Sequence, residues 1–106
     1  MEKWNNQKTK DLLRTILALK NEKEAKAFLR DLMTEKEIIE LGNRWKAAQM
    51  LAEGITYPKI QKETGLSTRT IARISDWLKN GKGGYKLALN KIHHHNSSQK
   101  RLVMTG

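Results

Sequence analysis

The amino-acid sequence predicts an all-α domain. Only one proline occurs in 106 residues, and no segment alternates apolar and polar residues as a half-buried strand does. Instead, apolar residues recur at three- and four-residue spacing, which is typical of amphipathic helices. One domain is expected for this length. We place a helical domain at residues 1–95 and a flexible basic tail at residues 96–106.

Three helices are expected in the first half of the chain. The first covers about residues 8–20, with leucine and isoleucine side chains along one stripe. The second, about residues 21–33, begins after Asn21, which is a favourable N-cap. The third, about residues 34–53, begins at Thr34, where the sequence Thr-Glu-Lys-Glu matches a capping box.

The next two helices are predicted to form a helix-turn-helix at about residues 56–79. Thr56 is expected to cap the first of them, and Pro58 lies in its first turn, where a missing N–H costs little. Gly65 falls where the chain must turn with positive φ, and Ser67 is a good N-cap for the following helix. The second helix of such a motif enters the DNA major groove.

The second helix of the motif has two different faces. Ile71 and Ile74 recur at helical spacing on one side, whereas Arg69 and Arg73 lie on the other. Arginines and short polar groups there can reach base edges and phosphates. Two ordinary amphipathic helices in a bundle are the alternative interpretation. The residues that we predict to contact DNA are Thr56, Tyr57, Lys59, Gln61, Lys62, Ser67, Thr68, Arg69, Thr70, Ala72 and Arg73.

The distribution of charge favours the DNA-binding interpretation. The chain has 21 Lys+Arg against 11 Asp+Glu, a net charge of +10. Residues 1–55 hold 11 basic and 9 acidic side chains, whereas residues 56–106 hold 10 basic and 2 acidic ones. The half with the helix-turn-helix is therefore expected to face a polyanion, since phosphate neutralisation supplies affinity that does not depend on sequence.

Other functional classes find no support in the sequence. There is no cysteine, which fits a reducing cytoplasm and excludes disulfides and cysteine-type zinc sites. No apolar run is long enough to span a membrane, and the first residues lack the apolar core of a signal peptide. The tract His93-His94-His95 makes a poor metal site, because consecutive helical residues point in different directions. We expect a cytoplasmic protein that is not an enzyme and has no metal or cofactor.

The number of apolar helix faces predicts self-association. A monomer of this size would struggle to bury all of them in one core. Dimerisation through the first three helices would solve this problem. It would also place two recognition helices on successive major grooves, about 34 Å apart for adjacent half-sites.

Residues 32–92 resemble the Trp repressor superfamily, and within it the YerC/YecD-like branch. The resemblance rests on Leu-Met-Thr-Glu-Lys-Glu-Ile-Ile-Glu-Leu-Gly-Asn-Arg-Trp at 32–45, Met-Leu-Ala-Glu-Gly-Ile-Thr-Tyr-Pro-Lys-Ile at 50–60, and Thr-Gly-Leu-Ser-Thr-Arg-Thr-Ile-Ala-Arg at 64–73. The later Gly-Tyr-Lys-Leu-Ala-Leu segment is similar too. From its own pattern, this segment is expected to form a sixth helix, after a loop at Gly81, Gly83 and Gly84. The resemblance implies an all-helical, intertwined homodimer that binds double-stranded DNA as a transcriptional regulator, with repression as the expected effect.

The same resemblance concerns a corepressor pocket. In the Trp repressor two arginines sandwich the indole of L-tryptophan, and Arg44 and Arg73 match them. Ile74 replaces a glycine and Trp77 a serine, so we expect the pocket to be filled by these side chains and L-tryptophan not to bind. Alternatively, the two arginines contact phosphates, which we favour for Arg73, or form surface ion pairs; Asp76 is expected to pair with Arg73. The pocket equivalents are Thr34, Arg44, Thr70, Arg73, Ile74 and Trp77.

Two functional hypotheses follow from the sequence. The first is a homodimeric, sequence-specific DNA-binding regulator that L-tryptophan does not control. The alternative is a helical module that binds nucleic acid without sequence preference, or binds a protein, without operator recognition. The ratio of specific to non-specific affinity distinguishes them, because charge alone gives binding without preference.

Overall fold

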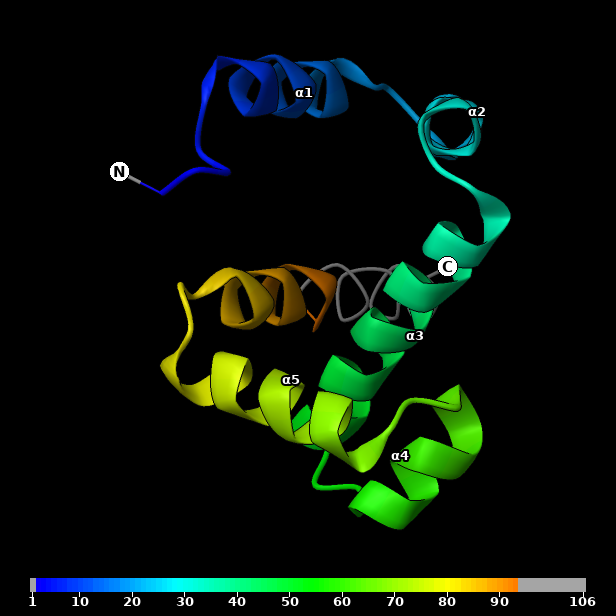
Figure 1. Cartoon of the computed structure of the whole chain (residues 1–106), viewed down its shortest axis with the longest axis vertical. Coiled ribbons are helices and arrows are strands. Elements are labelled where there is room, and N and C mark those ends of the chain that lie inside the picture. The colour runs from blue at the N-terminus through cyan, green and yellow to red at the C-terminus, as the bar shows by residue number, and fades with distance from the viewer. Residues whose placement is uncertain (1, 94–106) are drawn as a thin grey trace, which may run out of the picture. The chain divides into compact units, whose positions relative to one another are not determined.

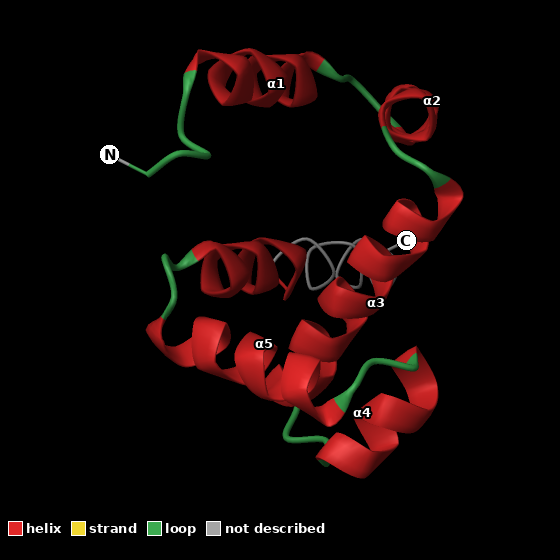
Figure 2. Cartoon of the chain, viewed as in Figure 1, coloured by secondary structure: helices red, strands yellow, loops and turns green. Residues whose placement is uncertain are grey.

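The computed structural model describes residues 2–93, and all regular structure in that range is helical (Figures 1 and 2). A sixth helix covers residues 84–93, at the end of the described range. This confirms the predicted all-α fold with six helices. The predicted tail at 96–106, together with His94 and His95, lies outside the described residues. The labelled helices are α1 (Gln7–Ala18), α2 (Glu22–Leu32), α3 (Glu35–Ala52), α4 (Tyr57–Thr64) and α5 (Thr68–Asn80).

The chain divides into two compact units, Met1–Ile39 and Glu40–Gly106, with the boundary inside α3. The second unit contains the buried core, which small and β-branched side chains fill. Ala47 and Ala48 come from α3, Ile60 from α4, and Ile71 and Ile74 from α5, and none of the five has exposed surface. Because all three helices contribute to this core, it fixes α4 and α5 against each other and against α3.

Within the second unit, aromatic stacking holds the helix at 84–93 against α3. The rings of Trp45 and Tyr85 lie 6.3 Å apart at an interplanar angle of 16°. Both residues pack against the buried core. This pair joins α3 to the helix at 84–93 by an offset-stacked contact, a geometry that aromatic rings favour.

The first unit has amphipathic helices but no buried residue in α1 or α2. Side chains of Asn6 and Asn21 cap the two helices, accepting hydrogen bonds from the backbone N–H groups of Thr9 and Glu24 at 3.1 and 2.9 Å. The cap predicted at Asn21 is thereby confirmed. The apolar stripe of α1 remains uncovered, and Leu17 is 84% exposed. Local hydrogen bonds rather than a core therefore define these helices.

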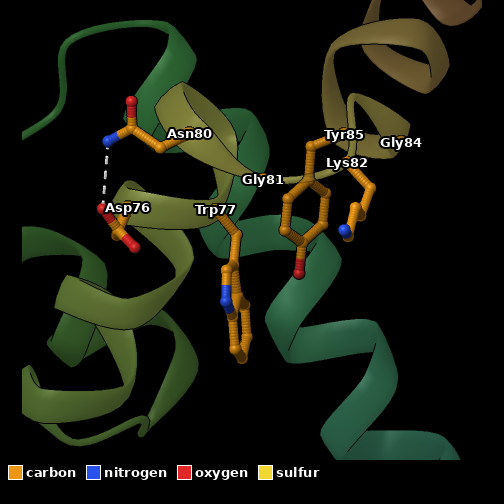
Figure 3. Close-up of a pocket in the computed structure, with 7 residues that line it drawn as sticks. All are labelled: Asp76, Trp77, Asn80, Gly81, Lys82, Gly84 and Tyr85. Carbon is orange, nitrogen blue, oxygen red and sulfur yellow. Dashed lines mark hydrogen bonds between the residues drawn. The ribbon is translucent and has the colours of Figure 1, made fainter. Parts of the chain in front are cut away.

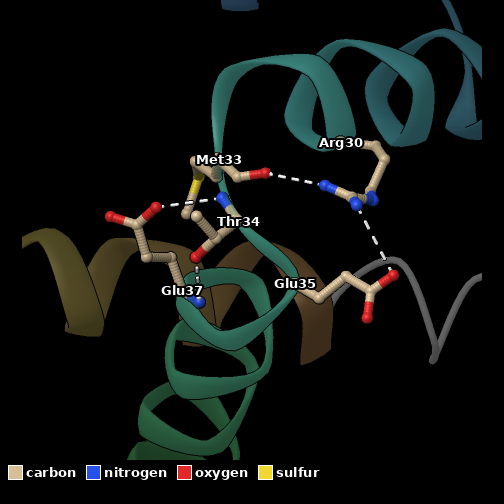
Figure 4. A network of polar contacts seen from close by, with 5 residues as sticks. All are labelled: Arg30, Met33, Thr34, Glu35 and Glu37. Atoms are coloured by element: carbon tan, nitrogen blue, oxygen red, sulfur yellow. Dashed lines mark hydrogen bonds and ion pairs between the residues drawn. The ribbon is translucent and has the colours of Figure 1, made fainter.

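The capping box predicted at Thr34 is confirmed (Figure 4). The Thr34 backbone N–H donates to Glu37 Oε1 at 2.9 Å, and the Glu37 N–H donates to Thr34 Oγ1 at 3.2 Å. Hydrogen bonding of the Glu37 carboxylate by Thr34, first by its backbone N–H and then by its side chain, lowers the pKa of the Glu37 carboxyl. Arg30 donates to the Met33 carbonyl oxygen at 3.1 Å and pairs with Glu35 at 3.5 Å. The start of α3 is thus fixed to the end of α2.

Candidate nucleic-acid interface

A tight turn at Gly65 joins α4 to α5, as the sequence predicts. Gly65 has φ +73°, in the left-handed region, and its N–H donates to the Gln61 carbonyl oxygen at 2.8 Å. Thr64 is 6% exposed, and its hydroxyl donates to the Ile60 carbonyl oxygen at 2.8 Å while accepting the Leu66 N–H at 3.2 Å. We did not predict this role for Thr64. The sequence does offer a signal for this role. Thr64 directly precedes the glycine that ends the helix, and a helical threonine hydroxyl can donate to the carbonyl oxygen four residues earlier.

The start of α5 is fixed by Ser67, which confirms the predicted cap. Ser67 Oγ accepts the Thr70 backbone N–H at 3.1 Å and donates to Thr70 Oγ1 at 3.0 Å. One serine therefore holds both the backbone and the side chain of Thr70. This double contact stabilises the first turn of α5, where recognition helices meet base edges.

The cap predicted at Thr56 is wrong. Thr56 occupies the N-cap position of α4 with extended backbone, but its side chain makes no capping hydrogen bond. An N-cap oxygen normally accepts the N–H of the second or third helical residue. Pro58 is the second residue of α4 and has no N–H, which removes one of the two donors.

The predicted DNA contacts lie on an exposed surface. Ten of the eleven side chains are exposed, and Thr70 is half-buried. In α5 the division between faces is sharp, because Arg69, Ala72 and Arg73 are exposed whereas Ile71 and Ile74 are completely buried. The helix therefore turns its isoleucines to the core and its cations outward.

The two arginines of α5 form no ion pair with any residue of the described part of the chain. The predicted pair between Arg73 and Asp76 is wrong, since Asp76 Oδ1 instead accepts a hydrogen bond from Asn80 Nδ2 at 3.1 Å. An exposed ion pair between two side chains of one helix stabilises that helix by only about 0.2–0.5 kcal/mol, which is too little to hold a long side chain in one position. The charges of Arg69 and Arg73 are thus available to an external anion.

The residues equivalent to a corepressor pocket have different surroundings. Arg44 pairs with Glu40 at 3.4 Å, and Thr34 belongs to the capping box in the first unit. Ile74 is a core residue without exposed surface, and Trp77 is 43% exposed. The Trp77 ring borders an open cavity, and the expectation that Ile74 and Trp77 fill a corepressor pocket stays a prediction.

That cavity, of about 790 Å³, lies between the end of α5 and the helix at 84–93 (Figure 3). The rings of Trp77 and Tyr85 project into it from the two helices. None of the other corepressor-equivalent residues lines it. Sequence reasoning missed this cavity because its two aromatic residues belong to separate helices. Its lining residues are Asp76, Trp77, Asn80, Gly81, Lys82, Gly84 and Tyr85.

The described part of the chain has no features of a membrane span or of a metal site. No helix within residues 2–93 is both long and apolar enough to cross a membrane. Nor do those residues contain a group of three or more His, Cys, Asp or Glu side chains that could hold a metal ion.

Comparisons with known proteins agree with this geometry. The family model described as Trp repressor protein matches residues 7–93. The uncharacterized protein YerC of Bacillus subtilis (strain 168) is 40% identical over 92 residues, which cover 87% of this chain and 88% of YerC.

Two solved structures are similar to this chain. A TrpR-like protein from Eubacterium eligens ATCC 27750 is 37% identical, with a TM-score of 0.82 over 86% of this chain and 94% of that one. A second structure, from Staphylococcus aureus, is 35% identical, with a TM-score of 0.80 over 86% and 91% of the two chains. The chain belongs to the Trp repressor family and is similar to YerC, and its fold with a helix-turn-helix is that of a DNA-binding regulator.

Proposed function

We propose that the chain is a sequence-specific transcriptional regulator, acting as a repressor, that binds double-stranded DNA as a homodimer. The observation that supports this most is the exposed face of α5. There Arg69 and Arg73 lack intramolecular ion-pair partners among residues 2–93, and the Ser67–Thr70 contacts hold the first turn. We also propose a cytoplasmic location, which a DNA-binding regulator of transcription requires.

The homodimer is supported by the uncovered apolar side chains of the first unit. No residue of α1 or α2 is fully buried, and an apolar groove of about 630 Å³ runs between α2 and the start of α3. Leu29, Ile38 and Ile39 contribute to this groove, and Ile39 is 63% exposed. Exposed apolar surface of this kind marks an interaction site, and a second copy offers a matching leucine-rich α1.

L-tryptophan is not proposed as the effector. Ile74 fills a core position, so the glycine that the repressor has there is replaced by a packed side chain. Trp77 replaces a serine and removes a polar contact at the same place. A ligand shifts an equilibrium only through different affinities for two states, and a site without room or polar partners gives little difference.

A competing function without operator recognition is favoured by one observation, the strong basic excess of residues 56–106. Selection of bound duplexes from a random pool tests the two. Sequence-specific binding predicts an enriched palindromic motif and at least about a thousandfold preference over random DNA at physiological salt. Equal affinity for all duplexes, with a steep salt dependence, would establish the non-specific module instead.

A further inference from the structure

The exposed face of α5 presents a guanidinium and a methyl group in a fixed order. Arg69 is the second residue of α5 and Ala72 follows three residues later, both exposed. Three residues advance about 4.5 Å along a helix axis. Base pairs of B-DNA are stacked about 3.4 Å apart. For a recognition helix that lies along the major groove, this separation brings the two side chains to base pairs one or two steps apart.

Arg69 is available for direct contact with a base. It has no ion pair with any residue from 2 to 93. Its place in the first turn is where recognition helices approach base edges. An arginine in the major groove binds O6 and N7 of guanine through two parallel hydrogen bonds, the commonest specific contact. Arg73, one turn later, is farther from the helix start and suits a phosphate.

The hydroxyl groups near the start of α5 say less about base identity. Those of Ser67 and Thr70 bond to each other at 3.0 Å, so they are partly engaged in holding the helix. Thr68 can donate or accept and hence suits several bases. Ala72 offers only a methyl group, and apolar contact with the thymine methyl is its specific interaction in the major groove.

We infer, building on the proposed function, that each half-site contains a guanine bound by Arg69 and a thymine, one or two base pairs away, contacted by Ala72. The inference therefore specifies two of the bases that the chain selects in each half-site. Its two contacts differ in chemistry, so modified bases can remove each one separately without disturbing base pairing.

The experiment begins with the duplex that the full chain selects from a random pool. Replacing the half-site guanine by 7-deazaguanine removes the N7 acceptor, and affinity for the wild-type protein should fall about fivefold or more. Replacing the thymine by deoxyuridine removes only the methyl group, and affinity should fall about two- to fourfold. Binding is measured at one fixed salt concentration by fluorescence anisotropy.

Variants assign each loss to a side chain. Arg69→Ala should bind the guanine and 7-deazaguanine duplexes equally, and Ala72→Ser should lose the preference for thymine over deoxyuridine. Arg73→Ala is the matched control, an arginine of the same helix one turn later, and should keep both preferences while binding more weakly. Circular dichroism checks that each variant is folded.

The outcomes separate this inference from the proposed function. A selected motif without a half-site guanine, or a wild-type protein insensitive to 7-deazaguanine, overturns the base assignment while leaving a sequence-specific regulator. A pool with no enriched motif removes sequence-specific regulation itself, and the base assignment with it.

Discussion

Ser67 and Thr70 are joined twice at the start of α5. The Ser67 hydroxyl accepts the Thr70 backbone N–H at 3.1 Å and donates to the Thr70 hydroxyl oxygen at 3.0 Å. The neighbouring Arg69 lies between them in the sequence and is exposed. The geometry of the first turn of α5 thus depends on Ser67, whose two hydrogen bonds both go to a residue three positions later.

Loss of this cap should destabilise the protein. Ser67→Ala is expected to lower the free energy of unfolding by about 0.5–2 kcal/mol, because one first-turn N–H loses its side-chain acceptor. Chemical denaturation of the two proteins measures the difference. Ser67→Asn restores a capping oxygen without charge and should recover most of the stability. If Ser67→Ala is as stable as the wild type, the cap contributes nothing.

The protein should sediment as a dimer. At micromolar concentration the expected mass is about twice the 12.2 kDa of one chain, because the apolar surface of α1 and α2 needs a partner. Leu17→Glu places a charge where the side chain is 84% exposed in one chain and should weaken the dimer. Lys10→Glu, a charge change on the same helix, is the control. A cooperative, fully helical wild-type monomer would contradict this prediction.

Lys59 and Arg69 should affect DNA binding differently. Arg69→Ala is expected to cost about 1–3 kcal/mol on the selected site and to relax preference at one position per half-site. Lys59→Ala, and likewise Lys62→Ala, should weaken binding to all sequences similarly and reduce the salt slope by about one. Titrations at several salt concentrations on specific and random duplexes measure both effects. Equal losses on both duplexes for Arg69→Ala would make Arg69 a phosphate contact.

L-tryptophan should leave DNA binding unchanged. Calorimetric titration with millimolar L-tryptophan is expected to give no saturable heat, since Ile74 is a core residue and Trp77 replaces a serine. Affinity for the selected duplex, measured with and without the amino acid, should agree. A tenfold gain, which corresponds to about 1.4 kcal/mol of coupling, would overturn this expectation.

A paired substitution tests the cause of that insensitivity. If bulk alone closes the site, the double variant Ile74→Gly and Trp77→Ser should gain weak tryptophan binding. Ile74→Gly also removes a core side chain, so the folded state of the variant is checked by its thermal transition. A folded variant that still gives no saturable heat on titration with L-tryptophan would mean that its site differs from that of the Trp repressor at further positions.

Glu37 should contribute to acid sensitivity. The backbone N–H of Thr34, and after it the Thr34 side chain, lower the pKa of the folded-state Glu37 carboxyl below the ordinary value of 4.5. The stabilisation is therefore complete above pH 4.5 and is lost as the pH falls through the lowered pKa. Denaturation from pH 6 down to pH 3 should show a shallower decline for Glu37→Gln than for the wild type. Parallel declines would exclude this contribution.

Features that depend on neighbours three or four residues apart could be predicted from the sequence. The caps at Asn21, Thr34 and Ser67 and the glycine turn at Gly65 belong to this group, as does the division of α5 into two faces. Each depends on hydrogen bonds within one turn or on helical periodicity, and both can be recognised from residues that are close together in the sequence. The local prediction failed at Thr56, where the proline in the first turn removes a donor.

Only the tertiary structure decided which side chains from different helices meet. Trp45 stacks on Tyr85 across 40 residues of sequence, and the same packing leaves Trp77 beside an open cavity while Ile74 is completely buried. Periodicity places Ile74 on the apolar face of α5, but nothing in the local sequence shows what borders Trp77. Their different surroundings follow from where α3 and the helix at 84–93 lie against α5, and that placement results from the packing of the whole unit rather than from any local segment.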